Sequence, residues 1–390
     1  MPAMTPLEAL FQAYEDARRN KRNTLNALAF ELNYETKLFS LYEEVMSGRY
    51  QIGSSVCFIS FNPVKREVFA ANFRDRIIHH FIYNYLSPIF ERLFINDDYS
   101  CRVDKGTSYG IKRADHFIRS CSENYIKDCY ILKLDIKGYF MSIDRTLLFE
   151  KVKSSVLRFR SEIDVDTDLL LGLIRQVVYN DPTKNCLVRG KRTGWVGLPK
   201  SKSLFFAGRD KGLPIGNLTS QLFGNVYLND FDYFIKCKLG CRYYGRYVDD
   251  IIIVHRDKEF LKSVIPVING YLRDILNLRL HPKKIYLQPY SKGVSFLGAI
   301  IKPHRIYTGN KTKGEFFRCV QKWNQCLFNH AGVMSQEEVQ KFVASVNSYL
   351  GAMKHYRTYK LRKRMLTEVL LKDWVKYIEI DPKYDKVIKK

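Results

Sequence analysis

Three aspartates lie where apolar, strand-like segments of the chain end. Asp135 closes the segment 130–135, and the adjacent Asp249 and Asp250 interrupt the aromatic and β-branched run 242–254. An unpaired carboxylate at such a position costs free energy and two neighbouring carboxylates repel each other, so the three need a strong counter-charge. Mg²⁺ binds one or two protein carboxylates and fills its other positions with water and phosphate oxygens. The pattern predicts a two-metal site, in which one ion activates an attacking hydroxyl and the other stabilises a leaving pyrophosphate.

A simpler interpretation applies to adjacent aspartates taken alone. In a turn, an aspartate side chain often caps its own backbone and binds nothing else. The second strand-terminal carboxylate, Asp135, lies 114 positions upstream of Asp249 in a similar aromatic context and weakens that interpretation.

The elements that must position these aspartates are short strands framed by helices. We expect a strand at 130–136 followed by a turn at Lys137-Gly138, and a hairpin over 242–254 with residues 248–250 at its bend. Thr5 and Thr24 are predicted to begin two helices within 5–47. The remaining expected elements are strands at 56–61 and 284–301 and helices at 74–93, 144–179, 217–239, 257–276 and from about 315 to 377.

Charge gives the first indication of a partner. The chain has 390 residues, 46% of them hydrophobic, and its 64 Lys and Arg against 40 Asp and Glu give a net charge of +24. A folded protein with such an excess favours a polyanionic partner, because neutralising phosphates releases counterions. Nucleic acid is therefore the expected partner, with solubility or a membrane-facing patch as the alternatives.

The cysteines and the N-terminal segment predict a location. The nine cysteines are odd in number, scattered, and without a CxxC pair, which argues against a disulfide framework or a structural zinc site. The first residues contain early acidic side chains and no apolar segment of the signal-peptide type, and no window of 18 apolar residues occurs anywhere. We expect a soluble, cytoplasmic protein with no membrane contact.

A long basic connection lies between the two groups of aspartates. Residues 181–212 hold eight basic and two acidic side chains, a local +6, interleaved with Trp195, Phe205 and Phe206. Connections of this length are usually functional or disordered. Cations on phosphates and rings on unpaired bases suit RNA, and an internal packing role is the alternative.

Several motifs resemble those of reverse transcriptases. Tyr247-Val-Asp-Asp250 resembles the YxDD signature of that family, and Leu132-Lys-Leu-Asp-Ile-Lys-Gly-Tyr-Phe140 resembles its first metal-binding motif. The other similar segments follow in the family's order: Lys65-Arg66 with Phe73-Arg-Asp-Arg76 (fingers), Tyr99–Gly106 (template and nucleotide support), Gly212–Gln221 (template side), Asn277–Lys284 (palm lysine) and Phe296-Leu-Gly298 (primer grip). The resemblance covers about residues 50–300.

The resemblance implies roles for individual residues. Asp135 and Asp249 would bind metal with the carbonyl of Ile136, and Asp250 would be the neighbouring acidic residue. Phe140, five residues after Asp135, would be the aromatic steric gate that blocks a ribose 2′-hydroxyl and so favours deoxynucleotides.

Basic residues would serve the nucleotide's phosphates. Lys65 and Arg66 are the candidates for a triphosphate clamp, with surface solvation as their alternative. Arg102 would belong to the block that supports the nucleotide. Either Lys283 or Lys284 would protonate the departing pyrophosphate, and the register favours Lys284.

Two positions depart from the common family pattern. Ile215 replaces the usual glutamine, and Gln221 stands where a proline is usual, a variant that resembles diversity-generating retroelement and defence-associated, group II intron-like bacterial lineages. The family's glutamine packs near the incoming nucleotide, so both positions are expected to line the nucleotide site. An aliphatic side chain at 215 removes hydrogen-bonding capacity there, from which we expect lower base discrimination.

These interpretations combine into one expectation. We predict an α+β right-hand polymerase fold with an N-terminal helical extension (1–49), fingers and palm (50–305, with the basic insertion 181–212) and a helical, basic thumb (306–390, net +9). The expected activity is RNA-directed DNA polymerisation with two Mg²⁺ ions, dNTPs and an RNA/DNA duplex, in a bacterial retroelement or antiviral defence system. Template RNA, and an accessory protein or noncoding RNA, would come from elsewhere. The alternative is an RNA-binding maturase or scaffold that retains the fold.

Overall fold

A computed structural model describes residues 4–19, 21, 24–61 and 64–390. Residues 1–3, 20 and 22–23 of the expected N-terminal extension, and 62–63 of the expected fingers, therefore lie outside the described residues. The chain forms two compact units, one comprising Met1–Gly110 with Leu132–Leu287 and the other Ile111–Ile131 with Gln288–Lys390.

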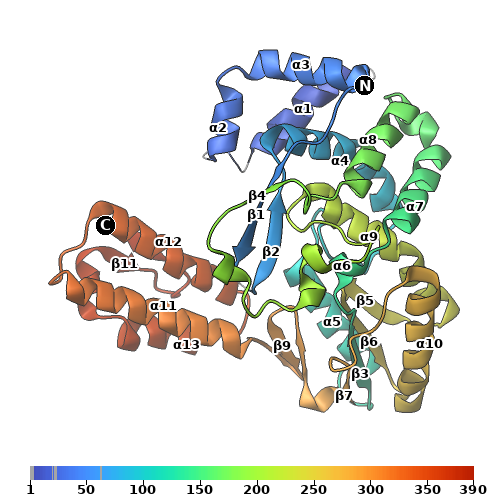
Figure 1. Ribbon diagram of the computed structural model, residues 1–390. Coiled ribbons are helices and arrows are strands. Elements are labelled where there is room, and N and C mark those ends of the chain that lie inside the picture. Colours follow the sequence, from blue (N-terminus) through green and yellow to red (C-terminus); the bar gives the residue numbers. More distant parts are fainter. Residues whose placement is uncertain (1–3, 20, 22–23, 62–63) are drawn as a thin grey trace. The chain divides into compact units, whose positions relative to one another are not determined.

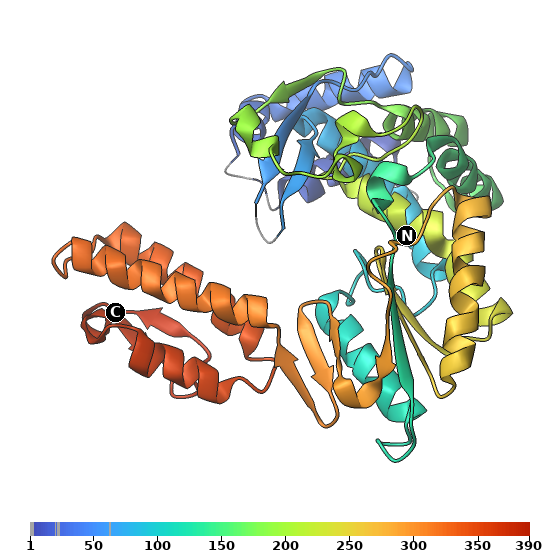
Figure 2. The ribbon, with the colours of Figure 1, turned by 60° about the horizontal axis from the view of Figure 1, so that its bottom comes forward.

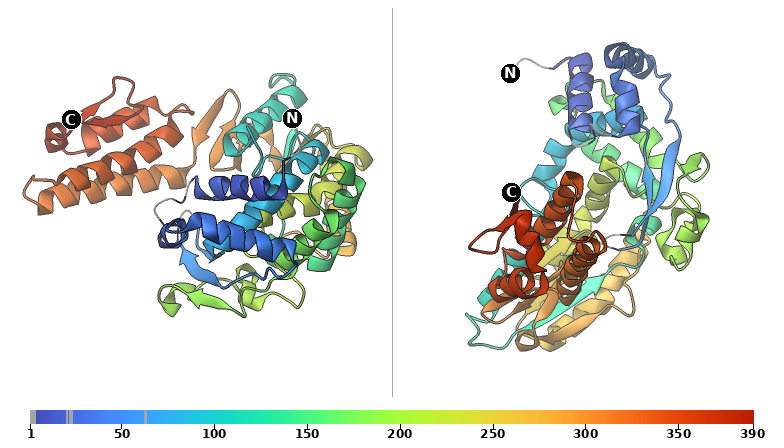
Figure 3. Two further views of the ribbon diagram at one scale, coloured as in Figure 1. Left: turned by 90° about the horizontal axis from the view of Figure 1, so that it is seen from above. Right: turned by 90° about the vertical axis from the view of Figure 1, so that its left-hand side faces the viewer.

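The N-terminal segment of the first unit consists of three helices beside a fourth. Helices α1 (Pro6–Arg18) and α2 (Leu25–Glu31) pack on α4 (Phe73–Leu93), and α3 (Tyr34–Met46) packs on α1 and α2 (Figures 1 and 3). Thr5 begins α1 with a capping box, since it accepts a hydrogen bond from the Glu8 amide and Glu8 accepts one from the Thr5 amide. The prediction of two helices within 5–47 was wrong, because Asn33 has a non-helical backbone (φ −143°, ψ 52°) and separates α2 from α3.

A small sheet joins the fingers segment to the basic insertion. Strand β1 (Ser55–Ser60) pairs antiparallel with β2 (Arg66–Ala70) and parallel with β4 (Cys186–Val188), in the order β2-β1-β4. Residues 181–212 thus contain a strand and three short 3₁₀ helices, at Arg192–Trp195, Lys200–Lys202 and Leu204–Phe206.

The central sheet carries the aspartates. Its strands β3 (Tyr130–Asp135), β5 (Tyr243–Tyr247), β6 (Asp250–His255) and β7 (Tyr286–Pro289) lie in the order β5-β6-β3-β7. Residues 251–254 of β6 are buried on both faces, so this strand reads as a continuous apolar run. Helix α10 (Lys258–Leu276) packs beside it through buried residues at helical spacing, Leu261, Val264, Ile268, Leu272 and Leu276 (Figure 2).

Further helices complete the first unit. The pair α7 (Arg145–Arg158) and α8 (Thr167–Tyr179) packs side by side, and α9 (Leu218–Tyr233) packs along α4. Between α4 and α9, the His79 Nδ1 lies 2.7 Å from the Thr219 hydroxyl, and both side chains are buried. The short helix α6 (Tyr139–Ser142) also belongs to this unit, whereas most of α5 (Thr107–Cys121) belongs to the second unit.

The second unit combines a three-stranded sheet with a helical core. Strands β8 (Val294–Phe296), β9 (Ala299–Lys302) and β10 (Arg305–Thr308) lie in the order β10-β9-β8. Helices α11 (Asn310–Asn329) and α12 (Gln336–Met353) pack together, followed by α13 (Tyr359–Arg364). The fully buried Trp374 stacks on Phe342, with ring centroids 3.8 Å apart. The chain then ends in a hairpin of β11 (Ile378–Ile380) and β12 (Val387–Lys389), beyond the helical pattern expected to about 377.

Two further features concern the cysteines and the helices. All nine cysteines are free thiols. Among the described residues, no helix is long and apolar enough to span a bilayer.

The buried His79 makes stability depend on pH. Burial, helped by the nearby charges of His80 and Arg76, lowers its pKa to about 3, so the folded protein keeps this imidazole neutral. Its stabilising contribution is complete above the ordinary histidine pKa and is lost as pH falls, because only the unfolded chain then takes up the proton. We expect the free energy of unfolding of the native protein to fall by about 1.4 kcal/mol per pH unit more steeply than that of His79→Gln between pH 6 and 4.

Urea denaturation at several pH values measures these slopes. The matched control is His116→Gln, which replaces an exposed histidine and should keep the native slope. Parallel curves for the native protein and His79→Gln would contradict the assignment.

Candidate active site

A tight turn presents Asp249. Strands β5 and β6 pair with Tyr247 opposite Asp250, which leaves Val248 and Asp249 as a two-residue turn. The predicted bend at 248–250 is therefore one residue too long, since Asp250 already belongs to β6. Val248 has φ +54°, a left-handed conformation that is unfavourable for a β-branched residue.

The end of β3 lies directly beside this turn. The Ile136 amide donates to the Asp249 carbonyl at 3.3 Å, and the His281 amide donates to the Asp135 carbonyl at 2.8 Å. Burial, together with the neighbouring charges of Asp135 and Asp250, raises the pKa of Asp249 to about 6. The structure thus brings together the three aspartates that the sequence singled out, together with Ile136.

Two lysines face two of the three carboxylates. The Lys284 Nζ lies 2.6 Å from Asp135 Oδ2, and the Lys133 Nζ lies 3.4 Å from Asp250 Oδ1. Asp249 makes no ion pair with any residue that the structure describes. Three negative and two positive charges leave the site net negative, and its donors are hard oxygen atoms, a set that fits a divalent cation such as Mg²⁺.

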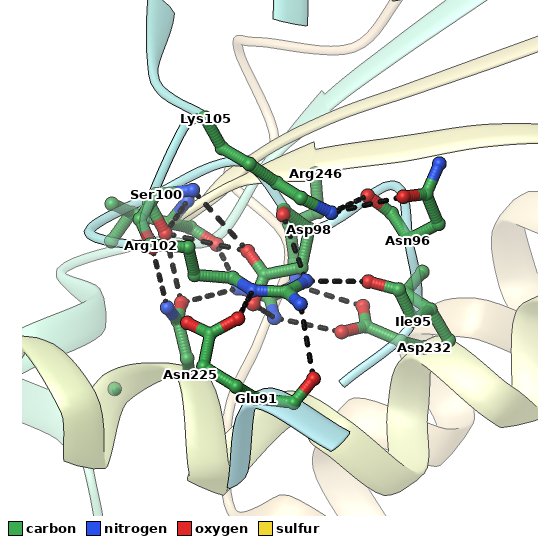
Figure 4. A network of polar contacts seen from close by, with 12 residues as sticks. Glu91, Ile95, Asn96, Asp98, Ser100, Arg102, Lys105, Asn225, Asp232 and Arg246 are labelled. Atoms are coloured by element: carbon green, nitrogen blue, oxygen red, sulfur yellow. Dashed lines mark hydrogen bonds and ion pairs between the residues drawn. The ribbon is translucent and has the colours of Figure 1, made fainter. Parts of the chain in front are cut away.

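A buried arginine, Arg246, bonds the turn that carries Asp249, and its ion pairs are drawn in Figure 4. Arg246 is fully buried, and its guanidinium contacts Asp232 at 2.7 and 2.8 Å and Asp98 at 3.1 Å. The Arg246 Nη1 also donates to the Val248 carbonyl at 3.1 Å. A charge-assisted bond therefore reaches the residue that precedes Asp249.

The amide side of the turn has its own partner. The Val248 amide donates to the Ser100 hydroxyl at 3.2 Å, and this hydroxyl donates to Asn225 Oδ1 at 2.8 Å. Both polar groups of Val248 are therefore fixed, one by Arg246 and one by Ser100. This fixation offsets the cost of the left-handed backbone and holds Asp249 in place.

The sequence analysis missed this supporting network. Arg246, a charged residue within a buried strand one position before the YVDD motif, was the signal that could have revealed it. Its partners could not be identified from spacing, because Asp98 and Asn225 are distant in the chain and meet it only through the fold.

Arg102 is held within the protein. Its side chain is 5% exposed and bonds the Glu91 carboxylate at 2.8 Å and the Ile95 carbonyl at 2.6 Å (Figure 4). These contacts tie the end of α4 to the loop that carries Asp98 and Ser100. The predicted nucleotide contact of Arg102 has no geometric support here, because its donors are occupied by protein acceptors.

Phe140 and Ile215 meet at one apolar cluster. Both pack, partly exposed, against the buried side chains of Cys57, Phe69, Met141 and Leu204. The Ile215 carbonyl accepts a hydrogen bond from the Phe69 amide at 2.8 Å. The predicted steric gate and the predicted specificity position thus pack against the same cluster, whereas Gln221 is exposed on the first turn of α9.

Gly216 makes this arrangement possible. Its φ is +128°, and a Cβ atom there would lie 2.8 Å from the Phe69 carbonyl oxygen. Only glycine allows the two chain segments to approach so closely.

The two predicted clamp residues differ in their surroundings. The Lys65 Nζ donates to the Val196 carbonyl of the insertion at 2.6 Å. Arg66 is exposed and close enough to Tyr247 that its charge opposes the rise in the Tyr247 pKa caused by burial. Arg66 is therefore an exposed cation near the hairpin, without an ion pair among the residues that the structure describes, and Lys65 is engaged with the insertion.

The insertion is anchored by a buried carboxylate. Glu67 of β2 is 1% exposed and accepts hydrogen bonds from the Trp195 indole, the Ser203 hydroxyl and the Leu204 amide at 2.6–2.8 Å. Trp195 therefore has the internal packing role that was the alternative to RNA binding, whereas Phe205 and Phe206 remain 42% and 60% exposed.

The insertion also reaches the turn after β3. Gly138 has φ +56°, and a Cβ atom there would lie 2.7 Å from the Ser201 carbonyl oxygen. The insertion is therefore packed against the loop that leads from Asp135 to Phe140.

Comparisons with known proteins find a family match and a curated relative. The family described as "Reverse transcriptase (RNA-dependent DNA polymerase)" matches residues 65–301, which is more than half of the chain. A curated relative, Protein YkfC of Escherichia coli strain K12, is 22% identical over 360 residues that cover 84% of this chain and 82% of that protein.

Solved telomerase structures are also similar. Telomerase of Candida albicans, in complex with a fragment of telomeric RNA, is 12% identical, with a TM-score of 0.47 over 85% of this chain and 63% of that one. Apo telomerase of Candida tropicalis is 12% identical, with a TM-score of 0.47 over 82% and 59%. The chain thus spans less than two thirds of the telomerase chains.

Removing the buried arginine should destabilise the fold. Arg246→Met leaves Asp98 and Asp232 without their counter-charge, and we expect the free energy of unfolding to fall by about 3–5 kcal/mol. Adding Asp232→Asn should restore part of this loss, because one buried charge is then removed.

Urea denaturation measures both effects against a matched control. Arg273→Met breaks an exposed ion pair with Asp274 and should change the free energy of unfolding by less than about 1 kcal/mol. Equal losses for Arg246→Met and Arg273→Met would contradict the role given to Arg246.

Proposed function

Since the chain belongs to the reverse transcriptase (RNA-dependent DNA polymerase) family, we propose that it copies a dedicated template RNA into cDNA at the site formed by Asp135, Asp249 and Asp250. The chain is an RNA-directed DNA polymerase of α+β, right-hand fold, and its partners include template RNA. The observation that supports the mechanism is the meeting of three carboxylates and Lys284 at the ends of β3 and the β5–β6 turn.

The carboxylates are the proposed metal ligands. Family members use divalent ions, and here Asp135, Asp249, Asp250 and the Ile136 carbonyl would hold two Mg²⁺ ions. When bound, the ions would lower the pKa of the primer 3′-hydroxyl and stabilise charge on the leaving pyrophosphate. Burial and neighbouring negative charges raise the Asp249 pKa, and a bound cation would offset both effects and keep the carboxylate ionised.

Lys284 is the proposed proton donor. Its ammonium lies beside Asp135 and is 52% exposed, so it remains accessible to a substrate. In the reaction, the primer 3′-hydroxyl would lose its proton to water, and its oxygen would form a bond to the α-phosphorus of a dNTP while the bond to pyrophosphate breaks. Lys284 then gives its proton to the pyrophosphate oxygen that leaves, which avoids an additional negative charge.

Phe140 and the basic residues would orient the nucleotide. The Phe140 ring would lie against the sugar and exclude a 2′-hydroxyl. Arg66 would bind the triphosphate, and Lys65 would join it after leaving the Val196 carbonyl. Arg102 would act indirectly, by fixing the loop of Asp98 and Ser100.

The biological setting is a finer proposal. The motif with Ile215 and Gln221 supports a bacterial retroelement or antiviral defence system. The Escherichia coli relative supports a bacterial origin of this motif. In either setting the protein would act in the cytoplasm with a noncoding RNA or an accessory protein. Sequencing the RNA and cDNA that co-purify with the protein distinguishes the two settings.

Loss of one ligand should abolish synthesis. We expect Asp249→Asn to lower dNTP incorporation more than about a thousandfold, because this carboxylate would hold an ion that supplies several kcal/mol of transition-state stabilisation. Magnesium-dependent primer extension on an RNA template measures this, and thermal melting checks the fold.

The matched control is Asp274→Asn, which changes an exposed carboxylate and should leave incorporation unchanged. An active Asp249→Asn enzyme would refute the site. A native protein that binds RNA but never extends a primer would instead favour a maturase-like or scaffold role.

Ile215 should affect fidelity. Because its side chain has no hydrogen-bonding group beside Phe140, we expect Ile215→Gln to lower misincorporation by several fold. Sequencing products of a defined template gives the error rate. Glu259→Gln, at an exposed position of α10, serves as the control. Identical error spectra for the native enzyme and Ile215→Gln would contradict the hypothesis.

A further inference from the structure

We propose that a pocket in the second unit binds an unpaired segment of single-stranded nucleic acid, independently of the polymerising residues. The pocket has a volume of about 940 Å³, within the range of small-ligand sites. We call it the arginine pocket, and it is lined by Asp115, Arg119, Asn124, Tyr125, His304, Arg305, Ile306, His355, Tyr356 and Arg357. None of these residues belongs to the candidate active site.

Three separate segments of this unit build the arginine pocket. They are the C-terminal half of α5 with the turn after it, the turn between β9 and β10 with the start of β10, and the connection from α12 to α13. The last two are joined, since the Arg357 amide donates to the Ile306 carbonyl at 3.4 Å. The buried Thr358 hydroxyl donates to the Met353 carbonyl at 2.7 Å and fixes the loop that carries the pocket residues 355–357.

The charge of the arginine pocket is positive. Three arginines face one carboxylate, Asp115, which already interacts with Arg119 and the Tyr125 hydroxyl. Arg305 and Arg357 are exposed, and neither forms an ion pair with any residue among those the structure describes. Two guanidinium groups without a counter-ion favour phosphate, which they can bind in bidentate geometry.

Aromatic rings lie beside these cations. The Tyr125 and His304 rings lie 4.4 Å apart at 59°, and Tyr125 also stacks on Tyr290 at 5.8 Å. Tyr356 is half-buried and His355 is exposed in the same pocket. Rings beside arginines are the combination that binds single strands, because bases stack on the rings while cations hold the backbone.

The backbone around the arginine pocket is strained. Glu123, Asn124 and Tyr125 follow one another with φ of +51°, +56° and +73°, and His304 has φ +61°. Residues other than glycine rarely adopt this left-handed backbone conformation, and those that do are concentrated at functional sites. The strained turn is held by the Ser122 hydroxyl, which accepts from the Tyr125 amide at 2.9 Å, and by Tyr290, whose hydroxyl donates to the Tyr125 carbonyl at 3.0 Å.

The rings select a single strand over other polyanions. In a duplex the faces of the bases are stacked on one another, so only phosphates would reach the pocket. An acidic peptide would likewise use the arginines but not the rings. Phosphates and bases are common to RNA and single-stranded DNA, and the experiment therefore compares the two.

Binding of fluorescent eight-nucleotide strands to the full-length protein tests the proposal. The probes are RNA, DNA of the same sequence, and the corresponding RNA duplex, measured by anisotropy without dNTPs. The variants are Arg305→Gln/Arg357→Gln, which removes the unpaired charges, and Tyr356→Leu, which removes a ring. The control Arg364→Gln/Lys372→Gln removes two exposed charges of the same unit outside the pocket.

We expect each pocket variant to weaken single-strand binding at least fivefold, and the control to weaken it less than twofold. The arginine variant should also reduce the salt dependence of binding, whereas Tyr356→Leu should not. Stronger binding of either RNA or DNA identifies the strand that the pocket takes.

Pocket variants that lose no more affinity than the control would overturn the proposal. The proposal would also fail if the pocket variants lost the same affinity for the duplex as for the single strand. It would fail as well if an acidic peptide displaced RNA from the native protein and Tyr356→Leu had no effect on binding. Failure here would leave the polymerisation site untouched, because extension of a pre-annealed primer depends on other residues.

Discussion

The buried charge of Arg246 is the constraint on which the candidate active site depends. A guanidinium that water cannot reach must be surrounded by carboxylates, and Asp232 and Asp98 come from two different segments of the chain to meet it. Burial raises the pKa of Asp98 to about 6 even though Arg246 opposes this rise. Strand β5, helix α9 and the loop after α4 are thus tied together at one point, directly behind the turn of Asp249.

The arrangement separates two electrostatic problems. On one side of the turn, the positive charge of Arg246 is compensated by Asp98 and Asp232, and these ion pairs make the region rigid. In front of it, Asp135, Asp249 and Asp250 repel one another, with Lys133 and Lys284 offsetting part of the charge. The ion pairs of Arg246 fix the turn that carries Asp249, so the three carboxylates cannot move apart to relieve their repulsion. This preorganisation is what a metal-dependent transfer reaction requires.

The sequence predicted the parts of the site that depend on short-range pattern. Apolar strands ended by aspartates located Asp135, Asp249 and Asp250, and the motif order led to the family. Contacts that depend on the fold were not predictable: the partners of Arg246, the internal bonds of Arg102, and the bond from Lys65 to the insertion. A basic residue in a motif carries no sign of whether its partner is a phosphate or a carbonyl of the same chain. The extra break at Asn33 was missed because apolar spacing continues across it.

The insertion that Glu67 anchors has a consequence for how such proteins could be recombined. Because this carboxylate is buried and takes three donors from residues 195–204, an insertion transplanted without β2 would lose its acceptor, and β2 without the insertion would bury an unsatisfied charge. The exposed stretch 190–193, which follows β4, takes no part in this anchor or in the pairing with β1. The two segments therefore form one exchangeable module, whose length can vary only within that exposed stretch.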